Sequence, residues 1–348
     1  MKIFSFTLLF FTFALSCLAQ KDITLEEIWD GAFRAEYLDE IQPMKDSNFY
    51  SVFTFDRQTR ETKIEQRSYT DKNHNEVILS STEIPIPYFE TYEFSEDENL
   101  ILLGAQIESR YRYTKSALYF IYNRTTKKLI QIFDKPIFNP TLSPNNKQIA
   151  FVFENNIYVK DITAEKITQI TKDGQKNSII NGLSDWVYEE EFELISSFDW
   201  NADGSKIAYL KFDESNVKEY NMEVYKNENY PDLETFKYPK AGEENSTVSL
   251  HVYDLKKANT SNIDLSKYES YYTPYLNWSK NANTLVVKCL NRHQNILQLV
   301  EVNTNNNSSV LLYEEKNNSY VEYNNHLTFL DNEAVSYTHL TLPTTPYV

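Results

Sequence analysis

Glycine and histidine are scarce in this chain, with 6 and 5 copies among 348 residues. No glycine lies in a Gly-x-Ser-x-Gly arrangement, so the strained serine turn typical of α/β-hydrolases is missing. The sequence also has no glycine-rich loop for a phosphate, and its histidines are isolated, without the paired spacing of metal ligands. We therefore expect no catalytic residue, no metal and no other cofactor in this chain.

Cysteine is rarer still, with two copies, Cys17 and Cys289. Cys17 lies in a segment typical of an export signal, in which Lys2 supplies positive charge and residues 3–15 form an apolar run. That run is too short to cross a bilayer comfortably. We expect a signal peptide over residues 1–19 and a mature chain whose single thiol, Cys289, lies in the core. The predicted location is periplasmic or extracellular; acylation of Cys17 and association with an outer membrane stay open.

Charge and aromatic content narrow the class of protein. The net charge is −16, from 50 acidic and 34 basic residues, which would repel phosphate backbones and argues against a nucleic-acid partner. By itself this charge indicates no more than a soluble acidic protein. Aromatic residues make up 15% of the chain, with 26 Tyr and 21 Phe, and this bias favours strands over helices.

One hairpin signature recurs along the chain. An aromatic or apolar pair is followed by Ser or Asn, a few polar turn residues and an alternating apolar strand. Copies begin at Tyr92, Pro140, Phe198, Leu276 and Leu327. Their spacing of roughly fifty to eighty residues is close to the length of a propeller blade with insertions. A β-sandwich could also supply hairpins, but repetition of one signature favours radial packing. We therefore predict an all-β fold of the β-propeller type.

Three other segments have readable patterns. Residues 23–29 predict a short helix, with Thr24 and Glu27 forming a capping box. The Asn-rich run 303–309 predicts a polar loop between strands. Residues 335–348 carry two prolines where a blade needs a paired strand, and they resemble a translated sequencing adapter. We expect this last segment to be a non-native tail.

An acidic insertion, residues 184–193, separates two of the hairpin signatures. Asp185 suits the cap of a short helix, which Trp186, Val187 and Phe192 would anchor while the adjacent glutamates face outward. Two neighbouring carboxylates repel one another, so a cation that they share is stabilised more than at one carboxylate. A primary ammonium has three donors and can bond both. A solvated acidic helix face is the alternative.

The sequence Asp-Trp-Val-Tyr-Glu-Glu-Glu-Phe at 185–192 closely resembles the double-glutamate motif of the dipeptidyl peptidase IV family. Further segments resemble motifs of the same family: residues 110–114, 238–245 with their continuation 252–255, and 290–295. The resemblance covers roughly residues 22–334. The family usually has Asn-Pro where this chain has Asn245-Ser246, a loop difference that we expect not to affect function.

The resemblance implies a fold and an activity. Members of the family join an eight-bladed propeller to an α/β-hydrolase domain with a Ser-Asp-His triad. They remove an N-terminal dipeptide from peptides that have Pro or Ala in second position. By position in the motif, Glu190 and Glu191 would bind the substrate's α-ammonium, with Glu189 as their structural neighbour. Arg110 would contact a backbone carbonyl of the substrate, and Arg112 is the competing alignment.

The domain organisation follows from this resemblance. We expect residues 20–334 to form a partial propeller with a short N-terminal helix and a helical insertion, and the catalytic domain to be absent. The predicted function is the substrate-binding part of an exported serine dipeptidyl peptidase that acts on peptides with a free N-terminus. Two alternatives stay open: a non-catalytic exported propeller that binds a protein or glycan, and a fragment of a prolyl tripeptidyl peptidase. A homodimeric parent also stays open.

Overall fold

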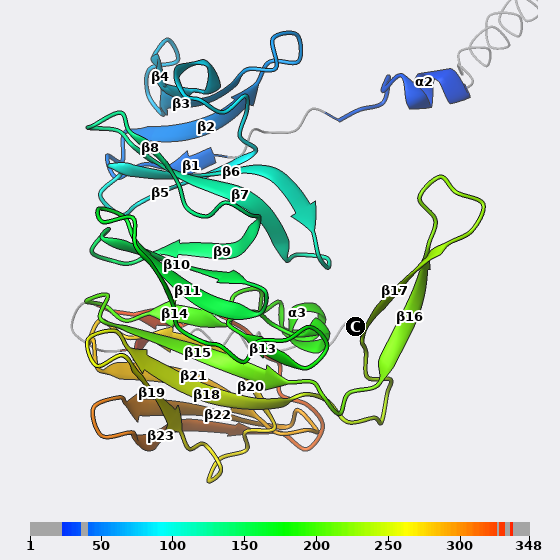
Figure 1. Cartoon of the computed structure of the whole chain (residues 1–348), viewed down its shortest axis with the longest axis vertical. Coiled ribbons are helices and arrows are strands. Elements are labelled where there is room, and N and C mark those ends of the chain that lie inside the picture. The colour runs from blue at the N-terminus through cyan, green and yellow to red at the C-terminus, as the bar shows by residue number, and fades with distance from the viewer. Residues whose placement is uncertain (1–22, 36–40, 326, 331–334, 337–348) are drawn as a thin grey trace, which may run out of the picture.

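The computed structural model describes residues 23–35, 41–325, 327–330 and 335–336. Helix α2 (Leu25–Trp29) comes first and stands apart from the sheets that follow (Figure 1). The Thr24 side chain accepts a hydrogen bond from the Glu27 amide, and the Glu27 carboxylate accepts one from the Thr24 amide. The short helix and its capping box are therefore confirmed. The predicted signal peptide lies outside the described residues and stays a prediction.

Antiparallel strands make up most of the described chain. The first sheet contains β1 (Ile41–Pro43), β2 (Phe49–Phe55), β3 (Thr62–Ser68) and β4 (Asn75–Ser80), followed by a 3₁₀ turn over Ser81–Glu83. A second group contains β5 (Thr91–Phe94), β6 (Leu100–Ser109), β7 (Lys115–Asn123) and β8 (Leu129–Gln131). A third contains β9 (Ile137–Leu142), β10 (Gln148–Phe153), β11 (Asn156–Asp161) and β12 (Ile167–Gln169). The second and third groups join where β7 pairs with β9.

The next sheet carries both insertions of the fold. Its strands are β13 (Ile179–Asn181), β14 (Phe198–Trp200), β15 (Lys206–Asp213), β18 (Thr247–Asp254) and β19 (Asn259–Ile263). Helix α3 (Trp186–Phe192) lies between β13 and β14, and a two-stranded arm, β16 (Glu219–Val224) with β17 (Asp232–Lys237), lies between β15 and β18. Another sheet contains β20 (Tyr272–Trp278), β21 (Thr284–Leu290), β22 (Ile296–Asn303) and β23 (Ser308–Lys316). Finally, β24 (Thr328–Phe329) pairs with β25 (Val335–Ser336).

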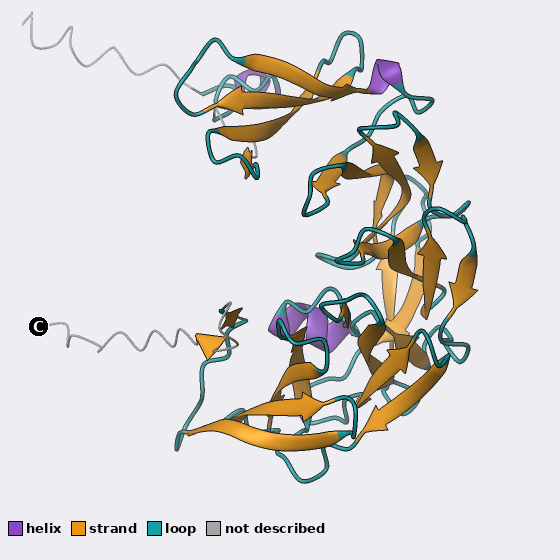
Figure 2. Cartoon of the chain, turned by 90° about the vertical axis from the view of Figure 1, so that its left-hand side faces the viewer, coloured by secondary structure: helices purple, strands orange, loops and turns teal. Residues whose placement is uncertain are grey.

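The sheets stand side by side in an open crescent, with α3 on its inner side (Figure 2). Four of the predicted hairpin signatures form the first two strands of a repeat, namely β5–β6, β9–β10, β14–β15 and β20–β21. The propeller-type fold predicted from the repeat is therefore confirmed. The signature does not identify the first sheet, because β1 (Ile41-Gln42-Pro43) lacks an aromatic residue followed by Ser or Asn.

Two tryptophans connect consecutive repeats in the same way. The Trp200 indole N–H donates to the carbonyl oxygen of Thr141 at 3.0 Å, and the Trp278 indole N–H donates to that of Asp199 at 3.1 Å. Both indoles are almost fully buried. Each bond spans from one repeat back to the preceding one, so the tryptophan of the signature joins neighbouring sheets as well as filling the core.

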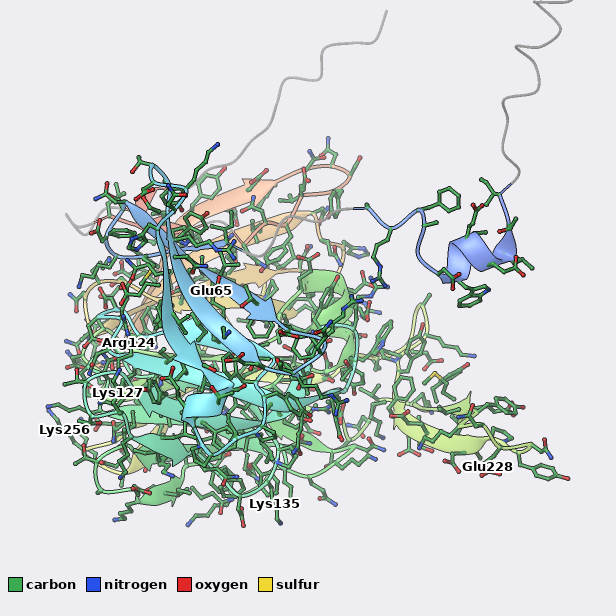
Figure 3. All side chains as sticks on the ribbon, turned by 90° about the horizontal axis from the view of Figure 1, so that it is seen from above. Glu65, Arg124, Lys127, Lys135, Glu228 and Lys256 are labelled. Carbon is green, nitrogen blue, oxygen red and sulfur yellow. The ribbon has the colours of Figure 1, made fainter. Side chains whose placement is uncertain are left out.

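Charged side chains lie mainly around the outside of the sheets, as Lys127, Lys135 and Lys256 show in Figure 3. The Lys135 ammonium also makes a cation–π contact, since it lies 5.2 Å from the centre of the Phe153 ring. Cys289 is fully buried, as predicted. No helix among the residues that the structure describes is long and apolar enough to cross a membrane.

Two further predictions concern the end of the described chain. The polar loop expected at 303–309 is present as a turn and is shorter than predicted, because Asn303 is the last residue of β22 and Ser308 the first of β23. Val335 and Ser336 pair with Phe329 and Thr328, respectively. Residues 337–348 lie outside the described part, so the prediction of a non-native tail there stays a prediction.

Candidate functional site

Helix α3 is a short element held by its ends and its apolar face. The Asp185 carboxylate accepts a hydrogen bond from the Tyr188 amide at 2.9 Å, so Asp185 is the N-cap that the sequence predicts. Glu193 ends the helix with a left-handed φ of 54°. Tyr188 is buried, and its hydroxyl accepts a hydrogen bond from the Thr273 amide at 2.9 Å. The helix is therefore fixed against the neighbouring sheet.

The three glutamates of the motif have different surroundings. Glu191 is exposed and Glu190 half-buried, whereas Glu189 has no exposed surface. The Glu189 Oε1 atom accepts hydrogen bonds from the amides of Tyr113 at 2.7 Å and Thr114 at 2.9 Å, and Oε2 accepts one from the Thr114 hydroxyl. Glu189 therefore faces inward and ties α3 to the turn between β6 and β7, whereas Glu190 and Glu191 keep exposed surface.

That turn carries both candidate arginines. The Arg110 amide donates to the Thr114 carbonyl at 2.8 Å and closes the turn. The half-buried Arg110 guanidinium lies 4.9 Å from the centre of the Tyr111 ring. Arg112 is exposed, and its Nε atom lies 3.5 Å from the Glu190 Oε2 atom. The structure thus brings the arginine segment and the double-glutamate motif together, with Arg112 in contact with Glu190.

Buried carboxyl groups lie next to Arg110. Burial raises the pKa of Asp185, while hydrogen bonds from Ser246 and Tyr188 and the positive charge of Arg110 oppose the rise. Burial also raises the pKa of Glu214 to about 7; the Asp185 charge adds to this, and Arg110 and Lys237 oppose it. Arg110 therefore stands in a partly desolvated acidic environment, where charge interactions are stronger than in water.

The other two motifs of the resemblance also lie at this site. Arg292 donates from Nη2 to the carbonyl of Glu243 at 3.0 Å and from Nη1 to the hydroxyl of Tyr271 at 2.8 Å. The Asn245 side chain donates to the Tyr272 hydroxyl at 2.9 Å. These bonds hold the loop after β17 against the sheet that contains β20 and β21.

Ser246 shows that the departure from the family pattern has a structural consequence. Its hydroxyl donates to the Asp185 Oδ2 atom at 2.6 Å, which leaves Oδ1 to accept the Tyr188 amide. A proline at this position would have no hydroxyl to donate. The sequence alone predicts this difference to be neutral for function, because a bond 61 positions along the chain cannot be read from the motif. It also does not point to Glu214, which belongs to none of the four motifs.

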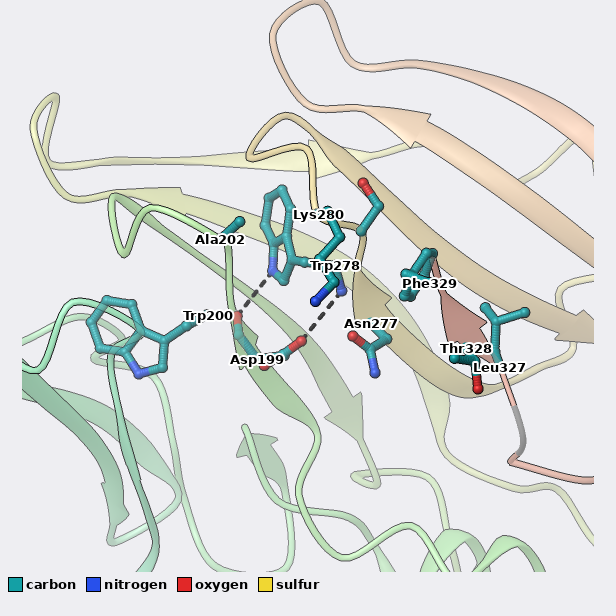
Figure 4. Close-up of a pocket in the computed structure, with 10 residues that line it drawn as sticks. Asp199, Trp200, Ala202, Asn277, Trp278, Lys280, Leu327, Thr328 and Phe329 are labelled. Atoms are coloured by element: carbon teal, nitrogen blue, oxygen red, sulfur yellow. Dashed lines mark hydrogen bonds between the residues drawn. The ribbon is translucent and has the colours of Figure 1, made fainter. Parts of the chain in front are cut away.

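A separate pocket of about 430 Å³ lies at strands β14, β20 and β24, between Asp199, Asn277 and Thr328 (Figure 4). Burial raises the pKa of Asp199 to about 6, and its carboxylate accepts a hydrogen bond from the Trp278 amide at 3.3 Å. Asp199 therefore joins two neighbouring repeats, and no residue of the four motifs lines this pocket. In the described part of the chain, no group of His, Cys, Asp and Glu residues is arranged to hold a metal ion.

Comparison with known proteins identifies the family. A family model described as the dipeptidyl peptidase IV (DPP IV) N-terminal region matches residues 95–341, more than half of the chain. The chain belongs to the dipeptidyl peptidase IV family. Its sheets form part of the N-terminal propeller region of that family, and the recognition based on four short motifs is confirmed.

Individual relatives support the same conclusion. The crystal structure of Porphyromonas gingivalis dipeptidyl peptidase 4 superposes with a TM-score of 0.79 at 34% identity, over 86% of this chain and 43% of that chain. A protein named "Probable dipeptidyl-aminopeptidase B" from Tuber melanosporum is 34% identical over 246 residues, 63% of this chain and 27% of the relative. An inactive dipeptidyl peptidase 10 from Mus musculus is 28% identical over 267 residues, 74% and 33% of the two chains. This dipeptidyl peptidase IV family chain therefore spans about a third of the length of these curated relatives.

Proposed function

We propose that the chain is the substrate-binding propeller region of an exported serine dipeptidyl peptidase that removes N-terminal dipeptides ending in Pro or Ala. In this proposal Glu190 and Glu191 bind the α-ammonium of the peptide, and Arg110 binds an adjacent backbone carbonyl. Membership of the dipeptidyl peptidase IV family supports the reaction class, and the catalytic triad would lie in a part of the protein beyond this chain.

The observation that carries the site assignment is the set of hydrogen bonds made by Glu189. This buried carboxylate accepts bonds from Tyr113 and Thr114, 75 and more positions earlier in the chain, and so holds the arginine turn against α3. An anionic pair and a guanidinium then belong to one rigid unit. The N-terminus of a peptide presents the matching groups, an ammonium followed by a carbonyl oxygen.

Such a unit would set which bond is cut. A peptide whose ammonium is held by two carboxylates, with its first carbonyls oriented, presents only its second peptide bond to a serine at a fixed distance. The peptide loses translational and rotational entropy when it binds, so this loss no longer contributes to the barrier of the chemical step. The ammonium would have to displace Arg112 from Glu190, which is feasible because Arg112 is 65% exposed in its side chain and solvated.

The test uses the complete protein encoded by the uninterrupted reading frame. We expect it to be recovered outside the cytoplasm, processed near residue 19, and to hydrolyse Gly-Pro-p-nitroanilide faster than a matched tripeptide p-nitroanilide. Faster release from the tripeptide would instead identify a prolyl tripeptidyl peptidase. Retention of the full-length product in the cytosol would contradict export.

The second candidate is a non-catalytic exported propeller that binds a protein or glycan. Similarity to the inactive dipeptidyl peptidase 10 of Mus musculus is the observation that favours it. Absence of a Gly-x-Ser-x-Gly serine in the remainder of the reading frame, together with no hydrolysis of either substrate, would support this candidate. A serine in that motif and measurable turnover would exclude it.

A further inference from the structure

The root of the β16–β17 arm carries three aromatic rings on one face. Tyr220 and Phe236 lie directly opposite each other in the strand pair, with ring centres 5.9 Å apart. Tyr238 follows Phe236 by two positions and therefore points to the same side; its ring lies 5.5 Å from that of Tyr220. The Tyr238 amide donates to the carbonyl of Lys218 at 3.0 Å, which extends the strand pairing to this residue. We call these three residues the root triad.

The root triad contacts both halves of the candidate site. The Tyr238 ring lies 4.3 Å from that of Trp186, the first residue of α3. The Phe236 ring lies 6.3 Å from that of Tyr111, over which the Arg110 guanidinium packs. Figure 1 shows that the arm stands off from the sheets and that its root lies on the side of the molecule where α3 is found.

The opposite face of the arm is fixed by a lysine. The Lys237 Nζ atom donates to the carbonyl of Val217 at 2.8 Å and lies 3.6 Å from the Glu219 carboxylate. The root therefore cannot rotate without breaking polar contacts on one face or ring contacts on the other. At the far end of the arm, Tyr230 is 86% exposed.

We propose that the root triad is a positioning element for the candidate site, which fixes the Arg110 side of the arginine turn relative to α3. The proposal rests on the proposed function. The Glu189 carboxylate bonds Tyr113 and Thr114, at the far side of the turn. The Arg110 guanidinium instead packs on the Tyr111 ring at 4.9 Å and lies 6.0 Å from the centre of the Phe138 ring. Phe236 supports the Tyr111 ring, and Tyr238 supports Trp186, so one rigid surface sets the distance between the guanidinium and the glutamate pair. Displacement by about 1 Å is enough to impair binding of this kind.

The experiment compares variants of the complete protein. Phe236→Leu and Tyr238→Leu remove a ring but keep an apolar side chain, Tyr238→Phe keeps the ring, and Tyr230→Leu is the matched control at the exposed end of the arm. For the two ring-deleting variants, we expect kcat/KM for Gly-Pro-p-nitroanilide to fall about tenfold, mainly through KM. Tyr238→Phe and Tyr230→Leu should stay within twofold of wild type.

Hydrogen exchange supplies a readout that needs no activity. The ring-deleting variants should lose backbone amide protection at residues 110–114 and 186–192, while β20–β23 stay as protected as in wild type. Unchanged protection in both segments would overturn the proposal, whatever the kinetics. If the wild-type protein cleaves neither dipeptide nor tripeptide substrates, the proposed function fails, and the exchange result still decides whether the root triad positions these segments.

Discussion

Three consecutive glutamates show how strongly the surroundings of a residue decide its task. An α-helix has 3.6 residues per turn, so Glu189, Glu190 and Glu191 point in different directions from α3. Glu189 meets three hydrogen-bond donors in the interior, Glu190 meets one exposed arginine, and Glu191 is exposed. Identical side chains at adjacent positions therefore have different surroundings, and the Glu189 carboxylate is bonded inside the protein.

Substitution of the outer pair should affect catalysis and leave folding unchanged. In the complete protein, Glu190→Gln or Glu191→Gln removes one carboxylate from a partly desolvated ammonium, which costs roughly 2–5 kcal/mol. At about 1.4 kcal/mol per tenfold change, kcat/KM for Gly-Pro-p-nitroanilide should fall at least about thirtyfold. The free energy of unfolding, obtained from thermal melting, should stay within about 0.5 kcal/mol of wild type. Activity within a factor of three for both variants would contradict the ammonium site.

Glu189→Gln is the matched control, because it changes the same group in the same helix. It loses charge-assisted hydrogen bonds inside the protein, so the free energy of unfolding should fall by about 1–3 kcal/mol. A lowered melting temperature for Glu189→Gln alone separates the structural carboxylate from the binding pair. Equal melting temperatures for all three variants would show that Glu189 does not hold the turn.

Glu214 should make stability depend on pH. Its pKa of about 7 lies above the value of about 4.5 in an unfolded chain, because the carboxyl is buried next to Asp185. Between these two values the unfolded chain loses its proton first. The free energy of unfolding therefore falls as pH rises from about 4.5 to 7, by up to about 3 kcal/mol. Below this window the carboxyl is protonated in both states and the stabilising effect is fully present.

The variant Glu214→Gln isolates this effect. Urea unfolding should give equal stability for variant and wild type at pH 4.5, and a more stable variant at pH 8, by up to about 3 kcal/mol. A difference between variant and wild type that does not change with pH would contradict the raised pKa.

At the scale of elements, β23 exposes a run of apolar side chains. Val310, Leu311, Leu312 and Tyr313 are between 42% and 59% exposed. Among the described residues, β23 pairs with β22 alone and is therefore an edge strand of its sheet. An open apolar edge favours association with other chains. We expect the chain expressed over residues 20–334 to self-associate.

Charges introduced on this strand should reverse the association. Val310→Lys combined with Leu311→Lys should shift the chain toward monomer in size-exclusion chromatography with light scattering, because charged side chains block edge pairing. Tyr230→Lys, at a more exposed aromatic residue of the arm, is the control and should have no effect. A monomeric wild-type chain with one sharp cooperative thermal transition would contradict the prediction.

For the whole molecule, stability depends on contacts between successive repeats. Trp200→Phe and Trp278→Phe remove the indole donors that bond the carbonyls of Thr141 and Asp199 in the preceding repeats. Each should lower the free energy of unfolding by about 1–3 kcal/mol, because a buried carbonyl loses its partner. Trp29→Phe is the control, since Trp29 is 85% exposed, and its denaturant midpoint should equal that of wild type. Equal midpoints for all three variants would show that the inter-repeat bonds contribute nothing.

The amino-acid sequence by itself determined the elements of this protein and its family. Capping by Thr24 and Asp185, the alternation in each hairpin and the turn residues after each first strand depend on residues a few positions apart. Such local patterns can be read without knowing how sheets pack. Repetition of the signature then favoured radial packing, and four short motifs were specific enough to indicate the dipeptidyl peptidase IV family.

Only the tertiary structure decided how the candidate site is assembled. The sequence could not reveal that Glu189 faces the Thr114 turn, that Ser246 bonds Asp185, or that the arm contacts Trp186. The first two contacts join residues 75 and 61 positions apart, so they depend on the placement of whole sheets. The burial of Glu214 arises in the same way. Local propensity acts over one turn of chain, whereas the direction and charge of a buried side chain depend on what the fold packs against it.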